Sequence, residues 1–155
     1  MKKSFTLKMT VLLLVVVCAF SFTRSIVSEE IKKIDYYGDA KNSNKLLELV
    51  KAELAAKRKP VLFFTATWCG PCKQFKNSLT DPLMIDAMKG CTLIMIEETI
   101  DNKSEKIGDK YKVTSYPTYI RVDAKGTALK KTDGGAWDAN IPKNMAPVLK
   151  EFLKN

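Results

Sequence analysis

The sequence contains no histidine. Imidazole is the side chain that most often acts as a general acid or base near neutral pH, and it is a common ligand of zinc and haem. Its absence excludes a Ser-His-Asp or Cys-His catalytic relay and any histidine-ligated metal centre. Chemistry in this protein must therefore use thiols, carboxylates, amines or hydroxyls.

Arginine is scarce, and the basic side chains are not clustered. The 155 residues include 26 lysines and arginines against 17 acidic residues, a net charge of +9, but only three of the basic residues are arginines. The longest basic run is residues 57–59. Nucleic-acid sites gather basic side chains on one surface, and arginine pairs best with phosphate. We interpret the charge as a solvated basic surface and expect no nucleic-acid partner.

Repeats and low-complexity segments are missing too, and the rest of the composition is typical of a globular protein. Hydrophobic residues make up 46% of the chain and charged residues 28%. A chain of this length is enough to bury one hydrophobic core. We therefore expect a single folded domain.

The first 21 residues have the pattern of a secretory signal peptide. Lys2 and Lys3 are followed by an almost unbroken apolar stretch over residues 9–22, and this order is typical of export signals. As a helix the stretch would span about 21 Å, which is shorter than the hydrocarbon core of about 30 Å. We expect cleavage after Ser21 and an extracytoplasmic location: periplasmic, secreted or on the outer face of the membrane.

Two alternatives to simple cleavage remain open. Cys18 ends the apolar run, so it could be the acylated cysteine of a bacterial lipoprotein. Val17 argues against this, because signal peptidases favour a small residue just before the cut. The segment could also stay uncleaved as a membrane anchor. In all three cases the rest of the chain lies outside the cytoplasm.

The remaining sequence predicts a polar extension over residues 22–41, with an edge strand near 34–37, and a domain over residues 42–155. Apolar spacing, caps and turn residues predict the elements of that domain. Pro147 is expected in the first turn of the last helix. The order predicts an α/β fold with helices on both faces of a sheet. The expected elements are a helix from 42 or 43 to 59, a strand over 61–65, a helix after 72, a helix over 82–88, a strand over 91–96, a helix over 104–111, strands over 118–122 and 127–129 around a turn at 123–126, and a helix over 144–154.

The Cys-x-x-Cys pair formed by Cys69 and Cys72 is the strongest functional signal. It lies between an expected buried strand and the start of a helix, where free backbone N–H groups and the helix dipole favour a thiolate. Cys69 is then the nucleophile, and Cys72 can attack the mixed disulfide that Cys69 forms. A zinc half-site and a structural disulfide are weaker alternatives, because zinc needs four ligands and the closed loop is very short. We expect a redox-active disulfide, no metal and no other cofactor.

Residues 64–73 and the Tyr-Pro-Thr step at 116–118 resemble the thioredoxin family, with similarity over about residues 46–153. The stretches 72–75 and 80–82 are most similar to exported members, such as the C-terminal domain of the transmembrane thiol:disulfide interchange reductase. The resemblance implies a thioredoxin fold, with a central mixed β-sheet flanked by helices on both faces.

The resemblance also implies roles for residues around the cysteines. Gly70 and Pro71 belong to the active-site loop, and Trp68 forms an apolar rim beside the thiolate. Pro117 is expected to be cis and to lie against the cysteine pair. Substrate binding is expected from three consecutive residues, with a glycine completing the groove. These residues are Tyr116, Pro117 and Thr118, and Gly134 or Gly135.

The sequence departs from the family at the position of a buried acid. Counting back six residues from Cys69 gives Phe63, which cannot carry a proton to or from Cys72. Glu97, at the end of the next expected strand, falls where the family carries a lysine. It is a candidate replacement base, or alternatively an exposed carboxylate at the end of a strand.

Cys91 is the odd thiol of the expected mature chain. It begins an apolar strand, so we expect a small buried hydrophobic side chain. A reactive or intermolecular role is the alternative for an unpaired cysteine in an exported protein.

These features predict an exported thiol:disulfide oxidoreductase, monomeric, that acts on cysteines or disulfides of other exported proteins. The Gly-Pro pair between the cysteines resembles reducing thioredoxins, with potentials of about −270 mV, rather than strong oxidants near about −120 mV. We therefore favour a reductase or isomerase, which needs a membrane partner to supply electrons. A disulfide-forming oxidase and a non-enzymatic binding module or adaptor are the alternatives.

Overall fold

The computed structural model describes residues 30–36, 43–98 and 105–154. The expected signal peptide and Cys18 lie outside these residues. None of the helices in the described ranges is both long and apolar enough to cross a membrane.

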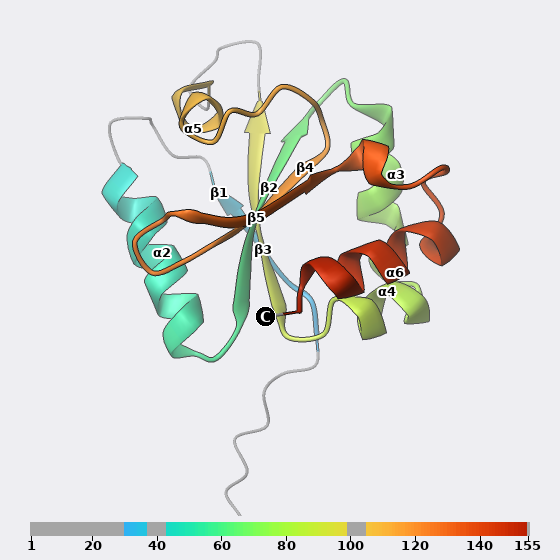
Figure 1. Cartoon of the computed structure of the whole chain (residues 1–155), viewed down its shortest axis with the longest axis horizontal. Coiled ribbons are helices and arrows are strands. Elements are labelled where there is room, and N and C mark those ends of the chain that lie inside the picture. Colours follow the sequence, from blue (N-terminus) through green and yellow to red (C-terminus); the bar gives the residue numbers. More distant parts are fainter. Residues whose placement is uncertain (1–29, 37–42, 99–104, 155) are drawn as a thin grey trace, which may run out of the picture.

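The centre of the molecule is a five-stranded mixed sheet (Figure 1). Parallel pairing joins β1 and β2 to the two sides of β3, whereas β4 and β5 run antiparallel beyond β2. This confirms the mixed sheet that the sequence resemblance implied. In spatial order the strands are β1 (Lys32–Tyr36), β3 (Cys91–Glu98), β2 (Lys59–Ala66), β4 (Thr118–Val122) and β5 (Ala128–Asp133).

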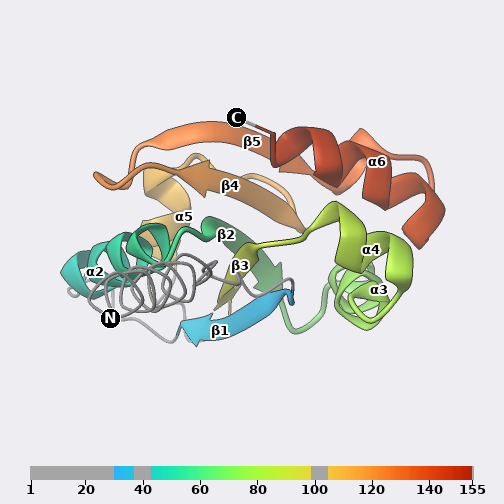
Figure 2. The same ribbon diagram turned by 90° about the horizontal axis from the view of Figure 1, so that it is seen from below.

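Helices cover both faces of the sheet, and each face has its own hydrophobic core (Figure 2). Strand β2 serves both cores because its side chains alternate between faces. Phe63 packs in the core with α3, α4 and α6, and Phe64 packs in the core with α2 and α5. The helices are α2 (Ser43–Ala55), α3 (Gly70–Ser78), α4 (Pro82–Ala87), α5 (Glu105–Lys110) and α6 (Pro142–Phe152), with a short 3-10 turn η3 at Gly134–Ala136.

Several elements differ in extent from the sequence prediction. The helix expected to reach residue 59 ends at Ala55, and β2 already begins at Lys59. The expected edge strand exists as β1, but it lies within residues 22–41, so the sheet extends N-terminal of residue 42. Strand β5 continues to Asp133. Helix α6 begins at Pro142, because proline suits the first helical position and the Ile141 carbonyl already accepts the N–H of Met145. Pro147 is therefore inside the helix, and the prediction that it lies in the first turn is wrong.

A buried polar network closes the end of the sheet where β2 and β3 begin. The Arg58 guanidinium donates to Thr92 Oγ1 at 2.7 Å and to the Cys91 carbonyl at 2.5 Å. Thr92 donates to Glu53 Oε2 at 2.7 Å, and Lys32 Nζ lies 2.5 Å from Glu53 Oε1. Buried charges are stable only when they are paired and hydrogen-bonded. The network meets that condition and joins α2, β1, β3 and Arg58, the residue just before β2.

Candidate active site

The two cysteines lie where β2 ends and α3 begins. Cys69 is the N-cap of α3, Pro71 is in its first turn, and Cys72 follows inside the helix. The cysteines form a disulfide with an S–S distance of 2.06 Å. The backbone N–H of Cys72 points at Cys69 Sγ from 3.1 Å. A main-chain donor and a helix N-terminus thus face the Cys69 sulfur, and both stabilise a thiolate there.

The two sulfurs are enclosed, and an aromatic side chain marks the surface next to them. Cys69 is 3% exposed and Cys72 is fully buried, whereas the adjacent Trp68 is 68% exposed. The Trp68 ring meets Tyr116 edge-on, with 5.7 Å between ring centroids. A large exposed apolar side chain marks a candidate contact surface next to the disulfide.

The segment that contacts Trp68 through Tyr116 contains the cis peptide bond that the family resemblance implied, between Tyr116 and Pro117. The Gly134 N–H donates to the Pro117 carbonyl at 3.0 Å, and a Cβ on Gly134 would lie only 3.0 Å from Pro117 Cδ. Thr118 is buried, and its hydroxyl donates to the Ser115 carbonyl at 2.7 Å. The structure therefore places Gly134, rather than Gly135, against the proline ring.

Aromatic side chains line the face of the sheet beneath α3, and one of them, Phe63, occupies the position at which the family resemblance implied a buried acid. Phe63 is fully buried and stacks on Tyr119, its register partner on β4, with ring centroids 5.1 Å apart. Phe75, one turn after Cys72 on α3, contacts both rings. The Phe63 position therefore supplies packing and no proton acceptor, as the sequence indicated.

Glu97 lies near the end of β3, aligned with Thr65 of β2. Its side chain is 28% exposed, and a carboxylate oxygen lies 4.0 Å from Lys76 Nζ. Lys76 is four residues after Cys72 on α3, so both side chains lie on one side of that helix. The carboxylate is therefore half-buried and faces a lysine of the helix that carries Cys72.

Cys91 is a buried free thiol at the start of β3. Burial raises its pKa to about 12. A thiol that stays protonated near neutral pH is a poor nucleophile. The prediction of a small buried hydrophobic side chain is confirmed.

Two features of the site were missed by sequence reasoning. The hydroxyls of Thr65 and Tyr119 are buried and have no hydrogen-bond partner among the described residues. Sequence alternation places both residues on the face that carries Phe63, but it does not show that their hydroxyls are unpaired. That fact requires the packing around them.

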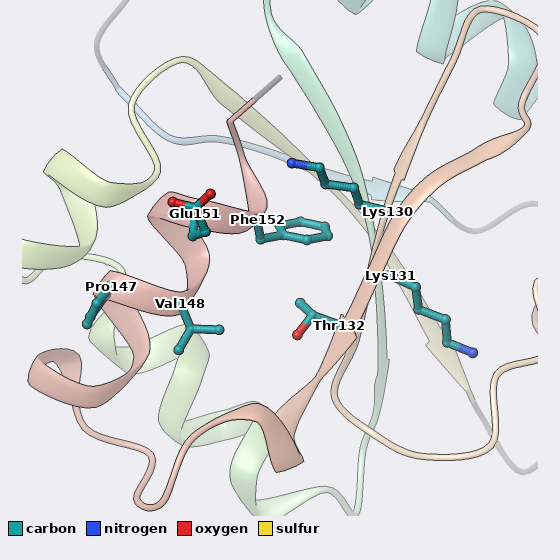
Figure 3. Close-up of a pocket in the computed structure, with 7 residues that line it drawn as sticks. All are labelled: Lys130, Lys131, Thr132, Pro147, Val148, Glu151 and Phe152. Carbon is teal, nitrogen blue, oxygen red and sulfur yellow. The ribbon is translucent and has the colours of Figure 1, made fainter.

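A hollow of about 650 Å³ lies between β5 and α6, and it contains neither cysteine (Figure 3). Val148 and Phe152 give it an apolar floor, and Thr132 points toward it from the strand. The described residues contain no group of three or more cysteines and carboxylates arranged to hold a metal ion.

Taken together, the fold, the Cys-x-x-Cys disulfide at a helix N-terminus and the cis-proline next to Tyr116, which contacts Trp68, define a dithiol–disulfide protein of the thioredoxin-fold class. The family model described as Thioredoxin matches residues 39–147. The chain belongs to the thioredoxin family.

Relatives and solved structures agree with this assignment. The chain is 33% identical over 70 residues to Thioredoxin-1 of Drosophila melanogaster, a match covering 45% of this chain and 62% of the fly protein. It is 32% identical over 94 residues to a thioredoxin of Echinococcus granulosus, a match covering 61% of this chain and 73% of that thioredoxin. The chain therefore spans about three fifths of the fly relative's length.

Two structural matches show the same fold. The thioredoxin of Trypanosoma brucei brucei matches with a TM-score of 0.54 at 23% identity, covering 79% of this chain and 88% of that one. A disulphide isomerase of Xylella fastidiosa Temecula1 matches with a TM-score of 0.56 at 20% identity, covering 76% and 92%.

Proposed function

We propose that this protein is an extracytoplasmic thiol:disulfide oxidoreductase that reduces or isomerises disulfides in other exported proteins. The observation that carries the proposal is the Cys69–Cys72 disulfide at the N-terminus of α3, with a backbone donor on Cys69 Sγ. Its position beside the exposed Trp68 ring supports access by a protein substrate.

The proposed reduction has two exchange steps. The Cys69 thiolate attacks one sulfur of a substrate disulfide, forming a Cys69–substrate disulfide and expelling the other substrate sulfur as a thiolate. Cys72 then loses its proton, and its thiolate attacks Cys69 Sγ. The Cys69–Cys72 disulfide forms, and the second substrate sulfur leaves and takes up a proton. Two electrons pass from the protein's dithiol to the substrate.

Substrate binding is assigned to the surface formed by Trp68, Tyr116 and Pro117. Gly70 and Pro71 shape the loop that holds the cysteines, and Thr118 anchors the proline segment through the Ser115 carbonyl. An extended substrate segment would pair with the backbone of Tyr116. The aromatic rim would exclude water around the mixed disulfide.

Glu97 is our candidate for the base that takes the Cys72 proton. The carboxylate lies beside Lys76 on the cysteine-bearing helix, and it aligns with the strand position four residues before Cys69. A carboxylate at this position is the kind of group that can accept a proton in an exchange reaction. Replacing Glu97 with Gln is expected to slow release of the second substrate sulfur while leaving attack by Cys69 unchanged.

The proposed location rests on the sequence outside the described residues, and the proposed electron donor is inferred from that location. Residues 1–21 resemble an export signal, and a reductase outside the cytoplasm must be reduced again after each turnover. We therefore propose a membrane partner that carries electrons to the Cys69–Cys72 disulfide. The Gly-Pro pair between the cysteines supports the reducing direction.

The test is the equilibrium reduction potential of the purified protein in glutathione buffers, with the cysteine state read by mass after alkylation. A potential near or below about −250 mV supports the reductase proposal, and one above about −150 mV makes the protein an oxidase. Failure to exchange at all would favour a binding module. In that case the double substitution of Cys69 and Cys72 by Ser would leave partner binding intact.

A further inference from the structure

The face of the sheet beneath Cys72 contains two buried hydroxyls that have no partner while the disulfide is closed. Thr65 is 1% exposed and Tyr119 is fully buried. Neither hydroxyl has a hydrogen-bond partner among the described residues. Burying an unpaired hydroxyl destabilises the folded state, so native proteins keep few of them. Two unpaired hydroxyls on one face of the sheet suggest that they find a hydrogen-bond partner in another redox state of the protein.

Both side chains leave the sheet on the face that α3 covers. Tyr119 is part of the buried cluster that includes Cys69 and Cys72, and its ring contacts Phe75, one turn after Cys72, at 4.9 Å between centroids. Thr65 lies two residues after Phe63 on β2, so its side chain leaves the sheet on the same face.

Reduction creates a new polar group in this cluster. Opening the disulfide gives a Cys72 sulfur that is buried, and resolution of a mixed disulfide requires that sulfur to become a thiolate. A buried thiolate needs hydrogen-bond donors, because burial alone favours the neutral thiol. Near the helix that carries Cys72, the structure places one ion pair, in which Glu97 on β3 lies 4.0 Å from Lys76 on α3.

We infer that the hydroxyls of Thr65 and Tyr119 are the donors held for the Cys72 sulfur of the reduced protein. This rests on the proposed exchange function and deepens it. The hydroxyls donate hydrogen bonds and transfer no proton: the Cys72 proton leaves to the base, and the thiolate attacks Cys69 Sγ as before. Burial raises the pKa of Tyr119 well above its ordinary value, so this hydroxyl keeps its hydrogen. The two neutral hydroxyls would thus stabilise the Cys72 thiolate without a charged side chain.

The test compares the oxidised and reduced protein in matched variants. Thr65→Val and Tyr119→Phe each remove one hydroxyl at nearly constant shape, alone and together, and Thr65→Ser keeps the hydroxyl as a rescue. Tyr111→Phe is the matched control, because Tyr111 packs in the opposite core and its hydroxyl donates to the Gly126 carbonyl at 2.8 Å. Thermal unfolding midpoints are measured in both redox states, and the exchange equilibrium is measured against glutathione.

The expected result is a selective loss in the reduced state. The double variant should move the glutathione equilibrium at least threefold toward the disulfide, with the unfolding midpoint lowered in the reduced form only. The pH at which mixed-disulfide resolution is half-maximal should rise, because loss of donors raises the pKa of Cys72. Tyr111→Phe should lower both midpoints alike and leave the equilibrium within twofold.

Equal shifts in the two redox states, with the equilibrium unchanged within twofold, would overturn the inference. If the double variant does not fold, the two single variants decide: at least one must move the equilibrium threefold, and neither doing so overturns the inference. Failure of the unmodified protein to exchange with glutathione would instead refute the proposed function. The two failures are therefore distinguishable.

Discussion

The two ends of the central sheet both bury cysteine sulfur, but they treat polar groups in opposite ways. At the end where β2 and β3 begin, Cys91 lies beside a charged network in which Arg58, Glu53 and Thr92 are joined by hydrogen bonds. At the other end, Cys69 and Cys72 lie over aromatic rings and two hydroxyls that are unpaired among the described residues. The polar groups of the first end have hydrogen-bond partners in the structure, whereas the two hydroxyls of the second end are, by the inference above, paired only after the disulfide is reduced.

This difference shows that burial does not separate a structural cysteine from a reactive one. Cys72 and Cys91 are both fully buried. What distinguishes them is the helix: Cys72 is in the first turn of α3 with its sulfur bonded to the N-cap, whereas Cys91 starts a strand and keeps a protonated thiol. Position relative to a helix N-terminus and to a second sulfur therefore decides reactivity here.

The largest expected effect comes from removing the resolving thiol. Cys72→Ser should stop turnover with a disulfide substrate, because the mixed disulfide on Cys69 then has no internal nucleophile to resolve it. We expect a fall in turnover of at least about a thousandfold, which corresponds to about 4 kcal/mol in activation free energy. The measurement is reduction of a protein disulfide, followed by mass spectrometry for the trapped Cys69–substrate adduct.

Cys91→Ala is the matched control, since it removes a thiol of equal burial at the opposite end of the sheet. Turnover of this variant should stay within about twofold, although the lost sulfur leaves a small cavity and lowers stability. A comparable loss of turnover in Cys91→Ala would show that the two ends are not functionally distinct.

Breaking the charged network should affect stability and leave the exchange equilibrium alone. Arg58→Met removes the donor to Thr92 Oγ1 and to the Cys91 carbonyl. Both buried acceptors then lose the hydrogen bond from Arg58. Removing one member of a buried charged network destabilises a protein by about 3 kcal/mol, measured by chemical denaturation. Lys150→Met, which breaks the exposed pair with Asp86, should change stability by less than about 1 kcal/mol.

The same network predicts a pH dependence that is smaller than the Arg58→Met effect. Burial tends to raise the pKa of Glu53, but hydrogen bonds from Lys32 and Thr92 and the charges of Lys32 and Arg58 outweigh it, so the net pKa is lowered. The stabilisation is then present above the unfolded-state value of about 4.3 and is lost as pH falls through the folded value. Glu53→Gln should flatten this acid limb of the unfolding profile. If stability still falls at low pH in Glu53→Gln as it does in the unmodified protein, Glu53 is not the cause of that fall.

Much of the fold was predictable from sequence because its signals are local. The apolar run of β2, the caps around α4 and the glycine turn before β5 each depend on neighbouring residues. The start of α6 was wrong because Ile141 caps the helix through its backbone rather than through a side chain. Cys69 and Cys72 could be assigned from their spacing, whereas the unpaired hydroxyl of Tyr119 depends on what packs around it across three elements.

The smallest expected effect tests how tightly Gly134 packs against Pro117 at the end of the sheet that carries Cys69 and Cys72. Gly134 has its N–H on the Pro117 carbonyl, and an added Cβ would approach Pro117 Cδ to 3.0 Å and Cγ to 3.2 Å. Gly134→Ala must therefore displace the proline ring by a few tenths of an ångström. Because Pro117 belongs to the proposed substrate surface, we expect KM for a protein disulfide to rise about threefold, or about 0.65 kcal/mol, with kcat nearly unchanged.

Gly108→Ala, whose Cβ would meet Val113 at an ordinary 3.8 Å, should leave KM unaltered. Equal KM in both variants would show that the proline ring tolerates displacement, and substrate affinity would then depend on the Trp68 and Tyr116 rim.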